Sequence, residues 1–300
     1  MHAFSYFTQK GEPRLGVEID GKKYNFTVIW QLFKDFKHVP HVPDLPFLQL
    51  AVEMEYFSRH SFMEVLDTVN SFHPLDDLVI DEKIRLDVPI SRPQKIICLG
   101  RNYTAHAEEW NSAVPDRPMF FSKLPSSLLP HEGKIEIPAN IGRVDHEIEL
   151  AVVIGEKARR VSEDSAMDHV AGYTIANDVT ARDMQKQDIE KGRPWSLSKG
   201  LDTFCPMGPY LVPADAVSNP HGLDMELTVN GVIKQKANTS DMVFKIPELI
   251  AYISRYVTLQ PGDIICTGTP EGTLPIQPGD VIEAKIEGLG ILKNTVAAVK

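Results

Sequence analysis

Cysteine is scarce in this 300-residue chain, and the three cysteines lie far apart. Cys98, Cys205 and Cys266 form no Cys-x-x-Cys pair, which argues against a disulfide framework or a zinc site. Positive charge is in the minority, because 31 lysines and arginines face 41 aspartates and glutamates, for a formal net charge of −10. This balance argues against nucleic acid or an anionic membrane as the main partner.

Long apolar runs are also missing. No stretch could span a bilayer, and residues 1–5 lack a basic region followed by a hydrophobic signal core. The apolar content of 43% and the charged content of 24% are ordinary for a soluble globular protein. We therefore expect a cytoplasmic protein with one large domain or two modest ones.

Prolines mark a joint between two parts of the chain. Pro89 and Pro93 flank the polar pair Ser91-Arg92, and proline disfavours central strands and favours extended linkers. We place the domain boundary near residue 92, with a small N-terminal α+β domain over 1–92 and a second domain over 93–300. The first part predicts strands over 3–8, 14–19 and 23–28 and helices over 29–36 and 45–60, with a further helix from Phe62. It holds no cluster of titratable groups, so we interpret it as a cap or dimerisation module.

The second part has mainly β character. Apolar and β-branched runs predict strands over 96–99, 119–123, 134–137, 148–154, 170–178, 210–212, 224–229, 232–235, 264–267 and 281–286. Helices are expected over 104–110 and 245–258 and around Asp183 and Asp188, and Asn230-Gly231 predicts a hairpin turn. The fold class predicted for the chain is α+β, predominantly β.

Two glutamates open the most apolar of these strands. Because side chains alternate along a strand, Glu147 and Glu149 point to one face and Ile148 to the other. Two neighbouring carboxylates at the start of a core strand repel each other, and a hard divalent cation would relieve that repulsion. A bare Glu-x-Glu is also compatible with two surface glutamates. Asp178, at the end of the 170–178 run, supplies a third carboxylate if the two strands are neighbours.

A histidine and a glutamate follow the strand over 96–99. In a helix over 104–110, His106 and Glu109 lie three residues apart on one face, so the carboxylate can orient the ring and raise its basicity. Such a pair can activate water as a general base. On spacing alone the pair indicates a solvated helix face rather than a catalytic dyad, and Glu108 is an adjacent alternative to Glu109.

Four motifs together resemble the fumarylacetoacetate hydrolase family. They are Gly100-Arg101-Asn102-Tyr103 with His106 and Glu109, then His146-Glu147-Ile148-Glu149-Leu150, then 177–183 (Asn-Asp-Val-Thr-Ala-Arg-Asp), and finally Thr267-Gly268-Thr269-Pro270. The resemblance covers roughly residue 95 to the C-terminus. It implies a mixed β-sheet roll of the family's C-terminal type, a homodimer, and one Mg²⁺ or Mn²⁺ per subunit bound by Glu147, Glu149 and Asp178.

The same resemblance implies roles for further residues. His106 and Glu109 would form a catalytic dyad in a mobile lid, and Lys199 would stabilise negative charge on the substrate. The remaining residues implied to bind substrate are Arg101, Arg182, Gln185 and Thr269. Lys123 is a weaker candidate for neutralising a substrate carboxylate.

The implied substrate is a small 2-oxo acid, converted through a pyruvate enolate. With water delivered by the lid, an acylpyruvate would be hydrolysed at a carbon–carbon bond; with water excluded, oxaloacetate would be decarboxylated. Isomerases and hydratases of 2-oxo-dioates use related enolate chemistry and stay open as alternatives. A non-catalytic metabolite-binding or scaffold protein of the same fold is the alternative from another class.

Overall fold

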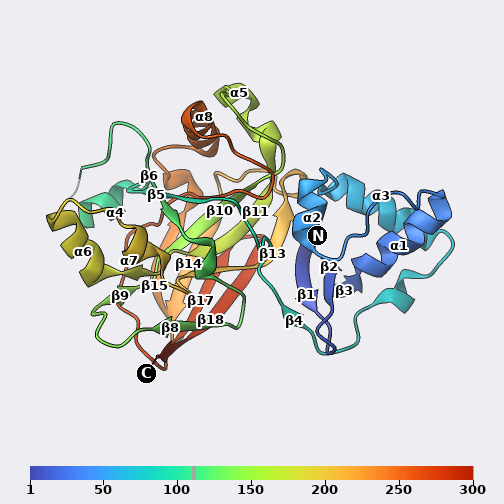
Figure 1. Cartoon of the computed structure of the whole chain (residues 1–300), viewed down its shortest axis with the longest axis horizontal. Helices are drawn as coiled ribbons and strands as arrows, with labels where there is room; N and C mark the ends of the chain where they lie inside the picture. The colour runs from blue at the N-terminus through green and yellow to red at the C-terminus, as the bar shows by residue number, and fades with distance from the viewer. Residues whose placement is uncertain (110–112, 300) are drawn as a thin grey trace.

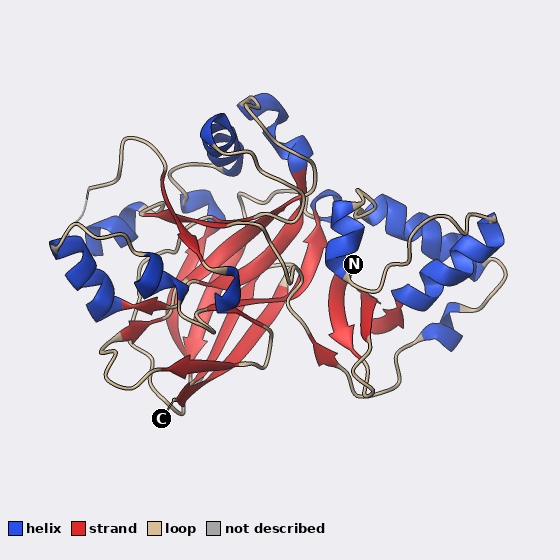
Figure 2. Ribbon diagram, viewed as in Figure 1, coloured by secondary structure: helices blue, strands red, loops and turns tan. Residues whose placement is uncertain are grey.

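The computed structural model describes residues 1–109 and 113–299. Two large sheets face each other in the part of the chain after residue 93, while the N-terminal strands and helices lie to one side (Figure 1). The larger sheet has the order β3-β2-β1-β13-β11-β10-β16-β5-β6, with β4 beside β1 and β7 beside β13. The smaller sheet has the order β15-β14-β17-β18-β8, and β9 pairs with β12. Strands dominate the described chain (Figure 2), so the predicted α+β, predominantly β class is confirmed.

The strands are β1 (His2–Phe7), β2 (Pro13–Ile19), β3 (Lys22–Asn25), β4 (Arg85–Leu86), β5 (Ile96–Gly100), β6 (Met119–Lys123), β7 (Leu128–Leu129), β8 (Lys134–Ile137), β9 (Val144–Asp145), β10 (Ile148–Ile154), β11 (Val170–Asn177), β12 (Thr180–Ala181), β13 (Cys205–Pro213), β14 (Asp224–Val229), β15 (Val232–Asn238), β16 (Ile264–Cys266), β17 (Val281–Ile286) and β18 (Gly290–Ala298). The α-helices are α1 (Phe26–Lys37), α2 (Leu48–Glu53), α3 (Arg59–Asn70), α4 (Thr104–Glu109), α5 (Glu163–Ala166), α6 (Arg182–Glu190), α7 (Ser196–Gly200) and α8 (Ile246–Tyr256). Among the described residues, no helix has the length and apolar character needed to cross a membrane.

Strand β10 is buried along its whole length because each of its faces meets a different apolar core. Leu150, Val152 and Ile154 pack into the core between the two sheets. Ala151 and Val153 point the other way, into a second core that continues into the N-terminal part. Burial on both faces explains why residues 150–154 of this strand are all apolar. Glu147 and Glu149 therefore lie on the same face of the strand as Ala151 and Val153, since side chains alternate.

The N-terminal part joins the rest through backbone pairing as well as apolar contacts. Strand β1 pairs antiparallel with β13, with Ala3 opposite Leu211, so β1–β3 extend the larger sheet. Asp215, just after β13, accepts hydrogen bonds from the backbone N–H groups of Arg59 (2.8 Å) and His60 (3.0 Å) at the start of α3. The division into domains at residue 92 stays a proposal, and in this structure both parts share one sheet and one core.

Two local predictions in the N-terminal part were wrong. The helix expected over 45–60 is broken after α2, where Glu55 adopts a left-handed backbone (φ 60°) and the Ser58 side chain caps the following helix α3. The strand expected over 23–28 ends at Asn25, whose side chain accepts a hydrogen bond from Val28 N and starts α1. In both cases a polar capping side chain determines the boundary, because it satisfies N–H groups that the first helical turn leaves open.

The predicted strands over 96–99, 119–123 and 264–267 and the predicted helix over 245–258 lie close to their observed bounds, whereas the strand expected over 210–212 is the end of the longer β13, which begins at Cys205. The hairpin turn at Asn230-Gly231 is present, with φ of 53° and 76°. The helix expected over 104–110 corresponds to α4, and residue 110 lies outside the described residues. Strand β18 was not predicted, although its burial alternates along part of its length.

Asp215→Ala is expected to lower the free energy of unfolding by about 1 kcal/mol, the usual cost of losing a helix N-terminal cap. The substitution leaves two N–H groups of α3 without their partner. Urea denaturation followed by circular dichroism measures the change. Asp215→Asn keeps an acceptor oxygen and should lose less, so a larger loss for Asn than for Ala would contradict this explanation.

Candidate metal centre and active site

Antiparallel pairing brings the three predicted carboxylates together. Ile148 of β10 lies opposite Asn177 of β11, so the end of one strand meets the start of the other. The backbone N–H of Asp178 donates to the carbonyl of Glu147 (2.8 Å), which fixes the two chain segments beside each other. Glu147, Glu149 and Asp178 are all buried, and each offers an oxygen within 4.8 Å of the others. That spread is about the width of one coordination sphere with metal–oxygen distances of roughly 2.1–2.6 Å.

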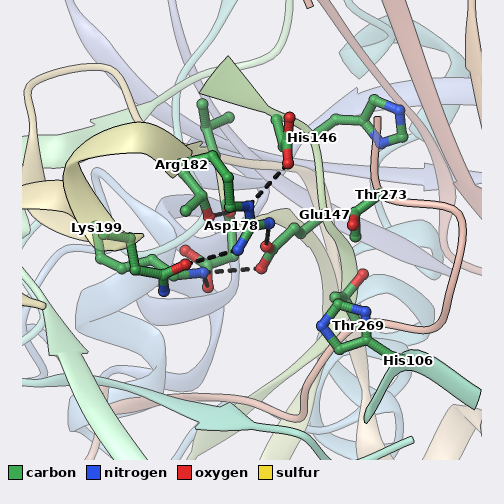
Figure 3. Close-up of polar contacts among 12 residues, drawn as sticks. His106, His146, Glu147, Asp178, Arg182, Lys199, Thr269 and Thr273 are labelled. Atoms are coloured by element: carbon green, nitrogen blue, oxygen red, sulfur yellow. Dashed lines mark hydrogen bonds and ion pairs between the residues drawn. The ribbon is translucent and has the colours of Figure 1, made fainter. Parts of the chain in front are cut away.

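Basic side chains surround two of the three carboxylates (Figure 3). Lys199 Nζ, from α7, lies 2.8 Å from Glu147 Oε2 and 2.6 Å from Asp178 Oδ2. Lys123 Nζ, at the end of β6, lies 2.6 Å from Asp178 Oδ1. Arg182, at the start of α6, pairs with Glu147. Each of these buried charges is therefore compensated by a partner of opposite sign, as burial requires.

Glu149 is in a different environment from its two neighbours. It accepts a hydrogen bond from the backbone N–H of Gly268 (2.8 Å), and no ion pair to it occurs among the described residues. Burial, followed by the charges of Asp178 and Glu147, raises the pKa of Glu149 well above its usual range. Burial would also raise the pKa of Glu147, but the charges of Lys199 and Arg182 outweigh it and hold that pKa low.

This donor set fits a hard divalent cation. Oxygen ligands from carboxylates are those that Mg²⁺ and Mn²⁺ prefer, and the three oxygens point to one place. A bound cation would also supply the positive charge that Glu149 lacks. Glu147, Glu149 and Asp178 would then hold the ion.

A cavity of about 250 Å³ opens beside the carboxylates. It is lined by most of the residues that the sequence singled out, namely Arg101, His106, Glu147, Glu149, Arg182, Gln185, Lys199 and Thr269. Apolar and aromatic side chains complete the wall, among them Leu99, Phe121 and Trp195. Asp178 and Glu109 lie behind this lining, in contact with Lys199 and close to His106 respectively. The cavity has the size and mixed lining of a site for a small polar molecule.

Helix α4 places His106 at the cavity, across from Lys199 (Figure 3). His106 Nδ1 lies 3.5 Å from Glu109 Oε2, and it is buried with no hydrogen-bond partner among the described residues. Burial lowers the pKa of His106, which favours the neutral ring that a general base needs. Both Glu109 oxygens are also within reach of the backbone N–H of Gly272, at 3.2 and 3.3 Å. Glu109 thus contacts both the histidine and the loop after β16.

Three buried side chains support this site and were not predicted to do so. Lys123 binds Asp178 and the carbonyl of Val179 (3.1 Å) and does not line the cavity, so the role considered for it at a substrate carboxylate does not agree with its position. Asn102 donates to the carbonyls of Phe244 (3.0 Å) and Thr267 (2.7 Å). These contacts link the segment before α4 to the chain just before α8 and just after β16.

Gln235 of β15 is the third of these side chains. Its Oε1 accepts from Ile148 N (3.1 Å) and lies 3.0 Å from His146 Nδ1, while its Nε2 donates to Thr269 Oγ1 and to the carbonyl of Pro270, both at 2.9 Å. One amide therefore joins the carboxylate strand to the Thr269 loop. The sequence offers no signal for this role, because Gln235 lies in a hairpin strand far from every motif.

A family comparison agrees with this fold and site. Residues 95–297 match the model described as "Fumarylacetoacetate (FAA) hydrolase C-terminal". The chain belongs to the fumarylacetoacetate hydrolase family.

Named relatives and solved structures extend the comparison. A mitochondrial oxaloacetate tautomerase of Xenopus laevis is 46% identical over 220 residues, which are 71% of this chain and 68% of that protein. A fumarylacetoacetate hydrolase from psychrophilic Exiguobacterium antarcticum superposes over 100% of both chains, with a TM-score of 0.80 and 32% identity. Fumarylpyruvate hydrolase from Pseudomonas aeruginosa, solved with Mn²⁺ and pyruvate, is 33% identical with a TM-score of 0.66, covering 69% of this chain and 91% of that one. The predicted roll of the family's type is confirmed.

Gln235→Leu is expected to lower the melting temperature by roughly 5 °C, because it leaves buried groups such as Ile148 N without a partner at about 1–3 kcal/mol each. Differential scanning calorimetry measures this change. Lys236→Leu, at the next and exposed position of β15, is the control and should leave the melting temperature within about 1 °C of the unsubstituted protein. Equal effects at both positions would contradict the bridging role of Gln235.

Proposed function

We propose that this protein is a divalent-metal-dependent enzyme that converts a small 2-oxo acid by stabilising its enolate. The observation that carries the proposal is the cavity itself, in which Lys199 and His106 lie on different sides of a buried three-carboxylate cluster. The cluster fits Mg²⁺ or Mn²⁺, and membership of an enzyme family supports catalysis over the alternative of a binding or scaffold protein.

Different residues of the cavity would carry out different parts of an enolisation. When bound, the cation would act as a Lewis acid toward the carboxylate and keto oxygens of the substrate. Lys199 supplies a fixed positive charge beside the oxygen on which negative charge develops. Asp178 and Glu147 outweigh the effect of burial and raise the pKa of Lys199, so it stays charged. His106, with a lowered pKa, accepts the proton that the substrate carbon releases.

Oxaloacetate is the substrate we put first. Removing a proton from C3 and returning it to the oxygen gives the enol, and loss of C4 as CO₂ gives the pyruvate enolate instead. Both steps pass through the charge distribution that Lys199 stabilises. The likeness to the oxaloacetate tautomerase of Xenopus laevis supports this choice.

Hydrolysis of an acylpyruvate is the second candidate. The 3.5 Å contact between His106 and Glu109 supports it, because a carboxylate that orients the ring makes histidine a suitable base for water. The likeness to fumarylpyruvate hydrolase with Mn²⁺ and pyruvate supports it as well. Isomerisation or hydration of a 2-oxo-dioate uses related enolate chemistry and stays an alternative. A homodimer in the cytoplasm and a separate domain over 1–92 remain part of the proposal.

The test compares oxaloacetate and acetylpyruvate in parallel with Mg²⁺ or Mn²⁺. Decay of the enol absorbance without CO₂ indicates tautomerisation of oxaloacetate, and CO₂ above the metal-only rate indicates decarboxylation. Acetate and pyruvate released from acetylpyruvate indicate hydrolysis. No acceleration of any of these reactions over the metal alone would contradict the proposed function.

Glu149→Gln is expected to reduce turnover at limiting Mn²⁺ by about 100-fold or more, because the substitution replaces a charged ligand by a neutral one. Isothermal titration calorimetry should show weaker Mn²⁺ binding in the same variant. Glu226→Gln, on β14 away from the cavity, is the control. Unchanged Mn²⁺ affinity in Glu149→Gln would contradict the assignment of Glu149 as a ligand.

His106→Ala is expected to lower kcat by about 10²–10⁴-fold, the usual contribution of a general base. Mn²⁺ affinity should change little, because no hydrogen bond or ion pair joins His106 to Glu147, Glu149 or Asp178 among the described residues. Titration calorimetry and steady-state kinetics on one preparation separate the two effects. Parallel loss of Mn²⁺ binding and kcat would instead make His106 a structural residue or a ligand.

A further inference from the structure

The hydroxyl of Thr269 lines the cavity on the side of His106 (Figure 3). Its Oγ1 lies 2.9 Å from Gln235 Nε2. An amide nitrogen only donates, so Thr269 Oγ1 must accept in this contact and keeps its own hydrogen for another partner. No acceptor for that hydrogen occurs among the described residues. The Thr269 hydroxyl is therefore available as a donor to a ligand.

The orientation of the Gln235 amide follows from its other partners. Ile148 N, which can only donate, lies 3.1 Å from Gln235 Oε1. The carbonyl of Pro270, which can only accept, takes the second hydrogen of Nε2 at 2.9 Å. A rotation of the amide by 180° would place donor against donor and acceptor against acceptor, and would leave buried polar groups unpaired. The amide thus has a single favourable orientation, which determines the direction of its hydrogen bond to Thr269.

The loop that carries Thr269 packs directly against β15. A Cβ built on Gly272 would lie 2.2 Å from the carbonyl oxygen of Lys234, so this loop and the strand are as close as glycine allows. Gln235 is buried, and its Nε2 binds two consecutive residues of the same loop, Thr269 and Pro270. The position of the Thr269 hydroxyl therefore depends on β15.

The carboxylate cluster has supports that do not involve Gln235. The backbone N–H of Glu147 donates to Asn177 Oδ1 (2.8 Å), and Glu149 accepts from Gly268 N (2.8 Å). Gln235 is absent from the lining of the cavity, so a ligand there does not touch it. An effect of Gln235 on ligand binding that passes through Thr269 can therefore be separated from an effect on the metal ligands.

We infer that Gln235 is a positioning residue, which holds the Thr269 hydroxyl as a hydrogen-bond donor toward an acceptor oxygen of the substrate. The inference rests on the proposed function, since a 2-oxo acid supplies that oxygen. It adds to the bridging role of Gln235 a defined effect on the substrate, because the amide determines which kind of ligand atom suits this side of the cavity.

A double-mutant cycle tests this inference, with pyruvate as the ligand of the Mn²⁺-loaded full chain and titration calorimetry below the melting transition. Gln235→Met removes the amide and should weaken pyruvate binding about 10-fold, because the hydroxyl is no longer held as a donor. Thr269→Val removes the hydroxyl and should weaken binding about 10–100-fold, as loss of a hydrogen bond to a charged ligand implies. In the Thr269→Val background, Gln235→Met should cost less than about twofold, since no hydroxyl is left to position.

Three controls accompany the cycle. Thr269→Ser keeps a hydroxyl, so Gln235→Met should again cost about 10-fold in that background. Lys236→Met introduces the same side chain at the next and exposed position of β15 and should leave pyruvate binding unchanged. Mn²⁺ affinity measured without pyruvate should change less than about twofold in Gln235→Met, because the carboxylates keep their own contacts.

The outcomes separate this inference from the proposed function. An equal loss of pyruvate affinity with and without the Thr269 hydroxyl would show that Gln235 acts on the fold in general, and would overturn the inference. A parallel loss of Mn²⁺ affinity, or unchanged pyruvate binding in Gln235→Met, would overturn it as well. Each of these results leaves the proposed function intact if the unsubstituted Mn²⁺-loaded protein binds pyruvate. If it does not, the proposed function fails and the inference fails with it.

Discussion

The electrostatic repulsion among three buried carboxylates is the constraint around which this molecule is arranged. Glu147, Glu149 and Asp178 lie within 4.8 Å of one another, where water cannot screen them. The opposing charges come from elements far apart in the sequence: Lys123 from β6, Arg182 from α6 and Lys199 from α7. Because each basic group must reach the same small volume, the cluster fixes where these elements lie relative to β10 and β11. Glu149 is left without a basic partner among the described residues, and this uncompensated negative charge makes a divalent cation a suitable ligand of the cluster.

Strand β10 combines this electrostatic constraint with a packing constraint. Its alternate residues serve two cores, so a shift of one residue would move Leu150 and Val152 into the space of the carboxylates. Such a shift would bury Glu149 among apolar side chains, at a cost that the fold could not compensate. The cost of burying Glu149 in the apolar core therefore determines the register of the strand, and the register determines where the carboxylates point. Stability and the geometry of the site depend on the same alternation.

The part of the site that the sequence predicted is the part that follows from local rules. Alternation placed Glu147 and Glu149 on one face, and helical spacing placed His106 near Glu109. The association with Asp178, by contrast, needed the pairing of β10 with β11, and family motifs supported it more strongly than spacing did. Gln235 and Lys123 escaped prediction because their partners lie 87 and 55 residues away in the sequence. The break after α2 was not predicted because of a local feature. The apolar periodicity continues across the boundary, and a single capping residue, Ser58, determines where α3 begins.

The contacts of Glu109 connect the position of α4 to the chemistry of His106. Glu109 accepts from Gly272 N and also lies beside His106 Nδ1. A net contribution of about 1.5–3 kcal/mol is typical for one hydrogen bond to a charged group, so this contact helps to hold α4 against the loop. In the arrangement described here, the carboxylate that holds α4 against the loop is the one that orients the imidazole. Because one carboxylate reaches both Gly272 N and His106 Nδ1, the position of α4 against this loop and the orientation of the imidazole depend on the same side chain.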